Sequence, residues 1–245
     1  MTETILVTGS SRGIGREIAL KAAADGANIV IAAKSAEPHP KLAGTIHSVA
    51  AEVEAAGGKA LALQLDVRDE QAVAAAMARA AEHFGGIDAL INNAGAIKLV
   101  GVEKLEAKRF DLMYQINTRA VMVCSQAALP CLKKTQGHIL SLSPPLNLDA
   151  KWFAQHGPYT VTKYGMSMLT LGMSEEFRKY GISVNALWPR TVIATAAIEF
   201  EAGGPAVMKA ARLPAIMADA AYAILSSQGR SISGDRKSTR LNSSH

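Results

Sequence analysis

The chain has 245 residues, of which 49% are hydrophobic, and its formal net charge is +5 at pH 7. These values suit one α/β domain with a large core. The chain contains no run of about eighteen apolar residues, so we expect no membrane span. The basic excess does not favour nucleic-acid binding. Residues 235–245 hold three of the 26 basic side chains against one acid, and no basic stripe with interleaved aromatic residues remains.

Two features bear on the cellular compartment. The first residues read directly as a strand and lack the regions of a signal peptide. Cys124 and Cys131 are seven residues apart on a predicted helix, which is too far for them to bond to each other. We therefore expect free thiols in a reducing compartment and a cytoplasmic protein.

A glycine-rich turn follows the first predicted strand. Residues 4–8 read as a buried strand, the turn runs from Thr8 to Gly15, and a helix continues to about Gly26. Glycines let the backbone approach a pyrophosphate, and the N-terminus of the helix offers it free N–H groups. The alternative is a tight turn without a ligand.

The second predicted strand, residues 28–33, bears on the choice of cofactor. An acid commonly follows this strand when the cofactor lacks a 2′-phosphate. Here Ala33 is followed by Lys34, and Arg12 lies in the glycine turn. The pattern favours NADP over NAD. The alternative is that Lys34 is a solvated lysine at the end of the strand, near Glu37.

The next elements are a turn at 37–40, a helix over 41–57, a strand over 59–65, a helix over 69–83 and a strand over 87–91. Asp66 either accepts a hydrogen bond from an adenine amino group or caps the following helix. Residues 92–95, Asn-Asn-Ala-Gly, either border a cofactor or satisfy local turn hydrogen bonds.

The second half of the chain continues the alternation. We expect a helical stretch over 103–134, a strand over 137–143 ended by Pro144 and Pro145, and a helix over 158–180. A strand over 182–187, a substrate-covering region over 188–214 and a helix over 215–227 follow. Asn117 interrupts the first helical stretch, where it either holds a water near the active site or makes a side-chain hydrogen bond in the core.

Tyr159 and Lys163 are four residues apart, which places both on one face of the predicted helix. A nearby ammonium favours the phenolate and lowers the pKa of a tyrosine, so this pair suits acid–base chemistry. The spacing alone is common on surface helices. Together with the upstream glycine turn, it predicts a nucleotide-dependent oxidoreductase on a doubly wound parallel sheet.

The motifs Thr8–Gly15, Asp66, Asn92–Gly95, Asn117 and Tyr159–Lys163, in this order and spacing, resemble the short-chain dehydrogenase/reductase family. The resemblance covers about residues 3–234. A narrower resemblance, to one group within the family, is carried by residues 31–34, 39–42, 143–148 and 186–189. The family resemblance implies one Rossmann-like domain over 1–234, and hydride transfer between NADP(H) and a carbonyl/alcohol pair.

The resemblance also implies roles for individual residues. Tyr159 would be the catalytic acid/base, Lys163 would bind the nicotinamide ribose and lower the pKa of the tyrosine, and Asn117 would anchor a proton-relay water. Lys34 would face the 2′-phosphate, Asp66 the adenine and Asn93 the adjoining ribose region. The implied cofactor contacts are completed by Gly9, Ser11, Arg12, Gly13, Ile14, Gly15, Val67, Ala94, Gly95, Pro189 and Val192. No metal site is expected.

The chain departs from the family pattern in three places. The family's catalytic serine aligns with Pro144, and Ser143 takes the position before it, where it either orients substrate or has no such role. Arg190 replaces the glycine of the family's Pro-Gly after the sixth strand, which suggests attraction of an anionic substrate such as an acyl thioester. Residues 235–245 are polar, so we expect a disordered or artefactual tail and a missing or aberrant seventh strand.

Other functions stay open. A non-catalytic dinucleotide-binding sensor or scaffold needs the same fold, and so does a lyase or epimerase with a bound cofactor. The apolar residues within 191–217 suit a lipid-like or acyl substrate, or they pack the covering region. We expect a small-molecule substrate and a homodimer or homotetramer formed through the helices around 103–134 and 158–180.

Overall fold

The fold is a parallel sheet between two layers of helices, as the sequence predicts. The computed structural model describes residues 3–201, 204–226, 233–234 and 236–238. Its strands pair in parallel in the order β3-β2-β1-β4-β5-β6-β7. The strands are β1 (Thr4–Thr8), β2 (Asn28–Ala33), β3 (Lys59–Gln64), β4 (Ala89–Asn92), β5 (His138–Ser141), β6 (Ser183–Trp188) and β7 (Arg236–Ser238). The strand order reverses between β1 and β4, and such a switch opens a crevice at the carboxyl ends of the strands.

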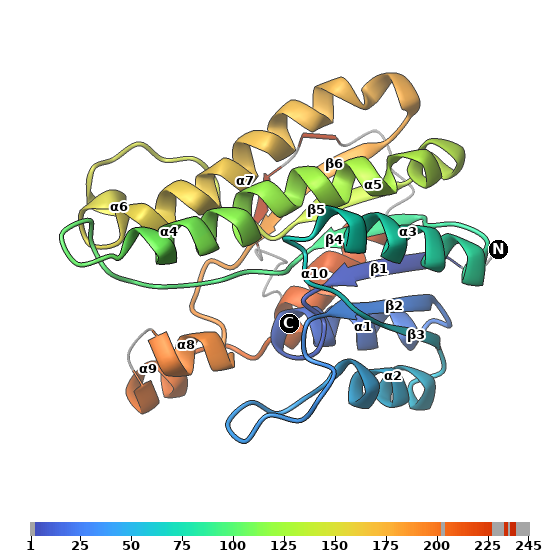
Figure 1. Ribbon diagram of the computed structural model, residues 1–245, viewed down its shortest axis with the longest axis horizontal. Coiled ribbons are helices and arrows are strands. Elements are labelled where there is room, and N and C mark those ends of the chain that lie inside the picture. Colours follow the sequence, from blue (N-terminus) through green and yellow to red (C-terminus); the bar gives the residue numbers. More distant parts are fainter. Residues whose placement is uncertain (1–2, 202–203, 227–232, 235, 239–245) are drawn as a thin grey trace, which may run out of the picture.

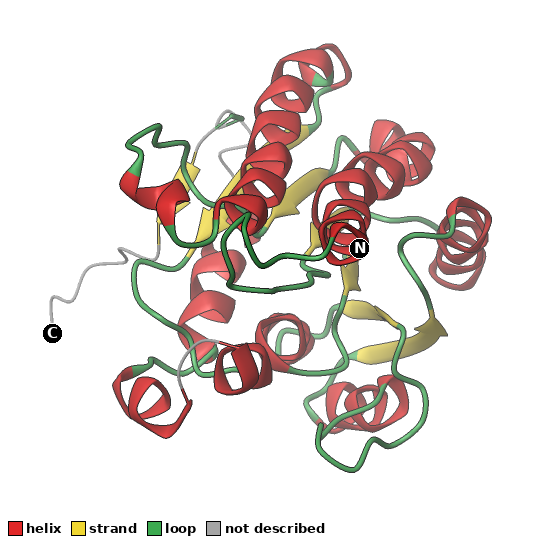
Figure 2. Cartoon of the chain, turned by 60° about the vertical axis from the view of Figure 1, so that its left-hand side comes forward, coloured by secondary structure: helices red, strands yellow, loops and turns green. Residues whose placement is uncertain are grey.

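Helices cover both faces of the sheet (Figure 1). One layer holds α1 (Gly13–Ala23), α2 (Ile46–Ala55) and α10 (Ala215–Ser226), and the other holds α3 (Glu70–Phe84), α5 (Ala120–Thr135) and α7 (Gly157–Glu176). The two layers are seen from another side in Figure 2. Neighbouring side chains of β1 point to opposite layers: Ile5 and Val7 pack with α1, whereas Leu6 packs with α3 and α5. The central strands are therefore apolar throughout, as expected for parallel strands covered on both faces.

The long helical stretch predicted over 103–134 is three joined elements. They are α4 (Ala107–Met113), the π-helix η1 (Tyr114–Arg119) and α5. Asn117 lies in η1, so the predicted interruption is found at the predicted residue. The short helices α6 (Lys151–Ala154), α8 (Ala196–Glu201) and α9 (Gly204–Ala210), and the 3-10 turn η2 (Arg178–Tyr180), were not predicted as separate elements.

The helix predicted from residue 41 begins later, at Ile46. Its N-cap is Thr45, whose hydroxyl accepts a hydrogen bond from the Ser48 N–H at 3.0 Å. The Ser48 hydroxyl accepts one from the Thr45 N–H at 2.9 Å. This reciprocal capping satisfies N–H groups at the start of the helix, and residues 41–44 remain in a loop.

The end of the chain bears on the expectation of a missing or aberrant seventh strand. Residues 236–238 form the short strand β7, which pairs with residues 186–188 of β6, so the strand is not missing but has only three residues. The rest of the predicted tail, residues 235 and 239–245, lies outside the described residues.

Both cysteines are free, and Cys124 is buried on α5. Burial raises the pKa of its thiol to about 12, which keeps it protonated at neutral pH. Among the helices of the described residues, none combines the length and the apolar composition that a membrane span requires.

Candidate active site

The glycine turn after β1 is shaped by close backbone contacts. Gly9 and Gly13 have φ values of 68° and 58°, a region that favours glycine. A Cβ on Gly9 would lie 2.8 Å from the Ala94 Cα, and one on Gly15 would lie 2.4 Å from the Asn93 Nδ2. At Gly13 the nearest atom to an added Cβ is the Thr195 Cγ2, 3.5 Å away. The turn is therefore packed against the segment after β4 at Gly9 and Gly15, while Gly13 faces the segment after β6.

Asn93, predicted near a cofactor ribose, holds the turn in place. Its Nδ2 donates to the carbonyl oxygens of Thr8 at 2.8 Å and Gly9 at 3.0 Å. The Thr8 hydroxyl oxygen accepts from the backbone N–H groups of Asn93 and Ala94, each at 3.1 Å. The stretch 92–95 therefore does satisfy turn hydrogen bonds, and these bonds join the carboxyl ends of the two strands at the switch point.

Arg12 reaches from the turn to the loop after β2. Its guanidinium donates to the Ala43 carbonyl at 3.0 Å, to the Gly44 carbonyl at 2.8 Å and to the Ser35 hydroxyl at 3.3 Å. Partial burial lowers the pKa of Arg12, which remains charged at neutral pH. Arg12 therefore lies beside the end of β2, where the sequence also places Lys34.

Lys34 is 72% exposed, and its Nζ lies 3.5 Å from the Asp66 carboxylate at the end of β3. Asp66 also accepts hydrogen bonds from the Arg68 guanidinium at 2.6, 2.9 and 3.2 Å. Hydrogen bonding to Arg68 lowers the pKa of Asp66 to about 2. Lys34 is therefore not an isolated strand-end lysine, but its pairing with Asp66 leaves most of its surface open to a ligand.

The capping alternative for Asp66 is wrong. Asp69 caps α3, since its carboxylate accepts from the N–H groups of Gln71 and Ala72, each at 3.0 Å. Val67 is buried beside Asp66. With its side chain outside the cap, Asp66 stays at the edge of the crevice.

Tyr159 and Lys163 lie one turn apart near the start of α7. The Tyr159 hydroxyl has no hydrogen-bond partner among the described residues, and burial raises its pKa to about 12. The expected lowering of the Tyr159 pKa by Lys163 is therefore not found, because burial desolvates the phenolate and raises this pKa instead. Burial also lowers the pKa of Lys163, to about 8.

Lys163 connects α7 to the segment after β5. Its Nζ donates to the Leu142 carbonyl oxygen at 2.7 Å. The next residue, Ser143, is buried, and its hydroxyl has no partner among the described residues; the same is true of Ser141. An unpartnered buried hydroxyl is costly to maintain. Ser143 therefore lies beside the anchor of Lys163 with its hydrogen-bonding capacity unused.

Asn117 makes side-chain hydrogen bonds in the core, which is one of the two roles that the sequence leaves open for it. Its Oδ1 accepts from the Ala96 N–H at 2.8 Å, and its Nδ2 donates to the Ala96 carbonyl and the Thr162 hydroxyl, each at 2.9 Å. Thr162 donates in turn to the Tyr159 carbonyl at 2.8 Å. These bonds link the loop after β4 to the helix that carries Tyr159. A π-helical turn such as η1 is often found at functional sites.

The segment after β6 completes the rim of the crevice. Pro189 is half-buried, whereas Arg190 and Val192 are exposed. Thr195, beside Gly13, was missed by the sequence reasoning. Its position within the predicted covering region, just before α8, was the available signal.

The sequence and structure comparisons identify the family of the chain. The family model described as short chain dehydrogenase matches residues 3–202, and the chain belongs to this family. Fold and family together make it a Rossmann-like oxidoreductase domain.

Individual relatives narrow the resemblance to one group. The chain is 59% identical over 224 residues to hydroxysteroid dehydrogenase-like protein 2 of Xenopus tropicalis, covering 91% of this chain and 53% of that protein. It is 58% identical over 222 residues to the protein of the same name from Homo sapiens, covering 90% and 53%. The resemblance to one group that the shorter stretches predict is therefore confirmed, and the chain spans about half the length of these curated relatives.

A solved structure supports the same family. The crystal structure of a short chain dehydrogenase from Mycobacterium thermoresistibile matches with a TM-score of 0.90 and 49% identity. The match covers 97% of this chain and 84% of that one.

Proposed function

We propose that this protein is an NADP(H)-dependent oxidoreductase that interconverts a carbonyl group and a secondary alcohol. One observation carries the proposal. The Lys163 ammonium is bonded to the Leu142 carbonyl, which brings the helix of Tyr159 next to the unpartnered hydroxyl of Ser143. This bond supports the proposal that the Tyr159 hydroxyl, the Lys163 ammonium and the Ser143 hydroxyl act together on one substrate.

Tyr159 is the acid/base in this proposal. Its hydroxyl is uncommitted and protonated at neutral pH, so it can give a proton to a carbonyl oxygen that is being reduced. Lys163 stabilises the phenolate that remains, and it also binds the nicotinamide ribose. Ser143 hydrogen-bonds the substrate oxygen and orients it. The Asn117 side chain is fully used by its core bonds, so its proposed part is to hold η1 where a relay water binds.

The crevice fits a nicotinamide dinucleotide. Two of its glycines admit no side chain, and the turn precedes α1, whose N-terminus presents N–H groups to a pyrophosphate. When bound, the cofactor supplies or accepts the hydride. Gly9, Gly13 and Gly15, with Ser11 and Ile14, would hold the phosphates, and Ala94, Gly95, Pro189 and Val192 would border the nicotinamide half.

The proposed NADP preference rests on charge at the end of β2. Lys34 and Arg12 lie there, and Ala33 stands where a carboxylate would repel a 2′-phosphate. The Asp66 carboxylate partly offsets these cations, but Arg68 neutralises it from the other side. The local balance therefore favours an added phosphate.

The substrate side of the crevice is apolar in part. Val192 and Leu213 are 43% and 73% exposed, whereas Ile193 and Met217 pack in the core. Some apolar side chains of the covering region are therefore packed in the core, and others are exposed. The exposed ones suit a lipid-like or acyl substrate, as the sequence suggests.

We propose self-association through η1, α5 and α7. These elements expose Tyr114, Met122, Val161, Met168 and Leu171. Apolar side chains gathered on neighbouring helices are typical of subunit interfaces. We also propose a cytoplasmic location on the basis of the free cysteines.

The Tyr159→Phe variant tests this function. It keeps the ring and removes the hydroxyl, so oxidation of NADPH by a panel of aldehydes and ketones is lost while NADPH binding stays within about twofold. Full turnover in this variant refutes the assignment of Tyr159. If the wild-type protein binds NADPH but turns over no member of the panel, the alternative of a dinucleotide sensor is favoured.

A further inference from the structure

A small cavity lies beside the predicted cofactor stretch, and the function proposed above assigns no role to its residues. It has a volume of about 150 Å³ and is lined by Ala96, Ile97, Lys98, Arg109, Leu112, Met113 and Glu201. Ala96 directly follows Gly95, so their Cα atoms are about 3.8 Å apart. The cavity therefore adjoins the wall of the proposed cofactor site.

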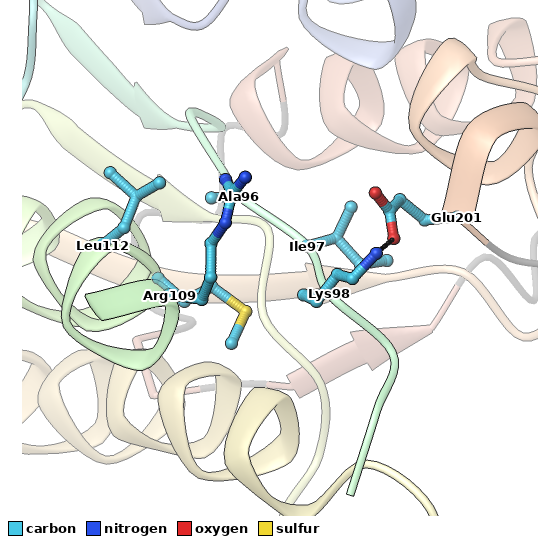
Figure 3. A pocket seen from close by; sticks show the side chains of 7 residues that line it. Ala96, Ile97, Lys98, Arg109, Leu112 and Glu201 are labelled. Carbon is cyan, nitrogen blue, oxygen red and sulfur yellow. Dashed lines mark hydrogen bonds and ion pairs between the residues drawn. The ribbon is translucent and has the colours of Figure 1, made fainter. Parts of the chain in front are cut away.

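The charges in this cavity are unequal. The Lys98 ammonium pairs with the Glu201 carboxylate at 3.0 Å, which ties α8 to the loop after β4. Arg109 projects from α4 and makes no ion pair or side-chain hydrogen bond among the described residues. Figure 3 shows the Lys98–Glu201 pair on one side of the pocket and Arg109 with Leu112 on the other. One guanidinium is thus left for a ligand.

The size and charge of the cavity select the ligand. Its volume is below the range of about 300–1,000 Å³ that is usual for a whole drug-sized ligand, so it suits one end of a longer molecule. A guanidinium binds a carboxylate through two parallel hydrogen bonds. A doubly charged phosphate would meet only one free cation and would be repelled by Glu201. The apolar walls of Ile97, Leu112 and Met113 suit an alkyl chain behind the carboxylate.

We infer that this cavity binds the carboxylate end of the substrate, with Arg109 as the recognising cation. The substrate class is then an oxo acid or hydroxy acid with an aliphatic chain. The identity of the bound molecule as the substrate rests on the proposed function, whereas the binding of a carboxylate in this cavity does not.

Binding of hexanoate, measured by ligand-observed NMR, tests the site without any turnover. Arg109→Gln raises the Kd for hexanoate at least about tenfold, because the charge-assisted hydrogen bonds are lost. Lys108→Gln is the matched control, since it removes one positive charge from the same helix, at a side chain that pairs with Glu106 outside the cavity. It changes the Kd less than about twofold. Hexanamide, which carries no charge, binds all variants alike.

A second variant gives an effect of opposite sign. Glu201→Gln removes the competing carboxylate and frees Lys98, so it lowers the Kd for hexanoate by about threefold or more. Equal weakening by Arg109→Gln and Lys108→Gln, or weakening by Glu201→Gln, overturns the inference. Unchanged NADPH binding in each variant verifies that the fold is intact.

The assignment to substrate is tested separately. In the wild-type protein, kcat/KM for an aliphatic oxo acid exceeds that for its amide, and Arg109→Gln removes the preference by raising KM. Hexanoate binding without such a preference refutes the substrate class and leaves the carboxylate site standing. Failure of the proposed oxidoreductase function would leave the hexanoate results unchanged, so the two failures are distinguishable.

Discussion

The Lys163 ammonium donates a 2.7 Å hydrogen bond to the carbonyl oxygen of Leu142. This bond fixes the helix of Tyr159 to the backbone one residue before Ser143. The family pattern assigns this cation to the cofactor ribose. In the proposed function, Lys163 therefore shares or exchanges this bond when the cofactor binds.

The two unpartnered serines, Ser141 at the end of β5 and Ser143 just after it, give a matched pair of variants. Ser143→Ala and Ser141→Ala each remove a buried hydroxyl that has no hydrogen bond, so each leaves stability unchanged or raises it by up to about 1 kcal/mol. Only Ser143→Ala lowers kcat, by about tenfold or more. Urea unfolding and steady-state kinetics measure the two effects. Equal turnover in the two variants would show that Ser143 does not contact the substrate.

The buried charge of Lys163 makes stability depend on pH. The pKa of Lys163 is about 8 in the folded protein and 10.5 in the unfolded chain. The unfolded chain therefore binds more protons between these two pH values. The cost of the buried charge is fully present below pH 8 and fades as the pH rises toward 10.5. The unfolding free energy of the wild type therefore rises by an amount on the order of 2 kcal/mol across this window, measured without added cofactor. The Lys163→Met variant lacks this rise.

Urea unfolding of wild type and Lys163→Met at pH 7, 8, 9 and about 10 measures the difference. Parallel pH profiles would mean that Lys163 is not desolvated. Above pH 10 the raised pKa of Tyr159 acts in the opposite direction, because the folded protein then holds the extra proton. The comparison is therefore confined to the lower part of the range.

Lys34→Ala separates the two cofactors. Lys34 is 72% exposed at the end of β2, so its removal disturbs only the pair with Asp66. It raises the Kd for NADPH by about tenfold and that for NADH by less than about twofold, since only NADPH carries the 2′-phosphate. Lys59→Ala, at the exposed start of neighbouring β3, is the charge-matched control. Equal losses for both cofactors would exclude contact between Lys34 and the 2′-phosphate.

Asn117→Ala leaves the buried hydrogen-bonding groups of Ala96 and Thr162 without their partner. We expect a loss of stability of about 2–3 kcal/mol. Thr162→Val removes the bond shared with Asn117 and the bond to the Tyr159 carbonyl, and it costs about 1–2 kcal/mol. The double variant is less destabilised than the sum, because both changes delete the shared Asn117–Thr162 bond. Additive effects in thermal or urea unfolding would contradict this network.

Much of the fold is predictable from local patterns. The apolar runs of β1 and β2 are buried on both faces of the sheet, which is why their bounds agree with prediction at every residue. The glycine turn is predictable because its backbone geometry requires glycine. Three-residue β7 has no such signal, since its partner is a strand far away in the chain.

The limits of prediction at the site have other physical causes. Asp66 and Asp69 both satisfy the pattern of a helix cap, and only the helix start decides between them. The pKa of Tyr159 depends on burial by distant segments, which the Tyr–Lys spacing does not report. Thr195 is brought to Gly13 by the path of the chain after β6. Contacts between distant segments, rather than local pattern, settle the last two points.

Titration of the purified protein with NADPH and with NADH, followed by nicotinamide fluorescence, tests the central claim most directly. The account predicts saturable binding of both, with a Kd for NADPH at least about tenfold lower. Tighter binding of NADH would contradict the assignment of Lys34 and Arg12. Binding of neither would show that the glycine turn serves only the fold.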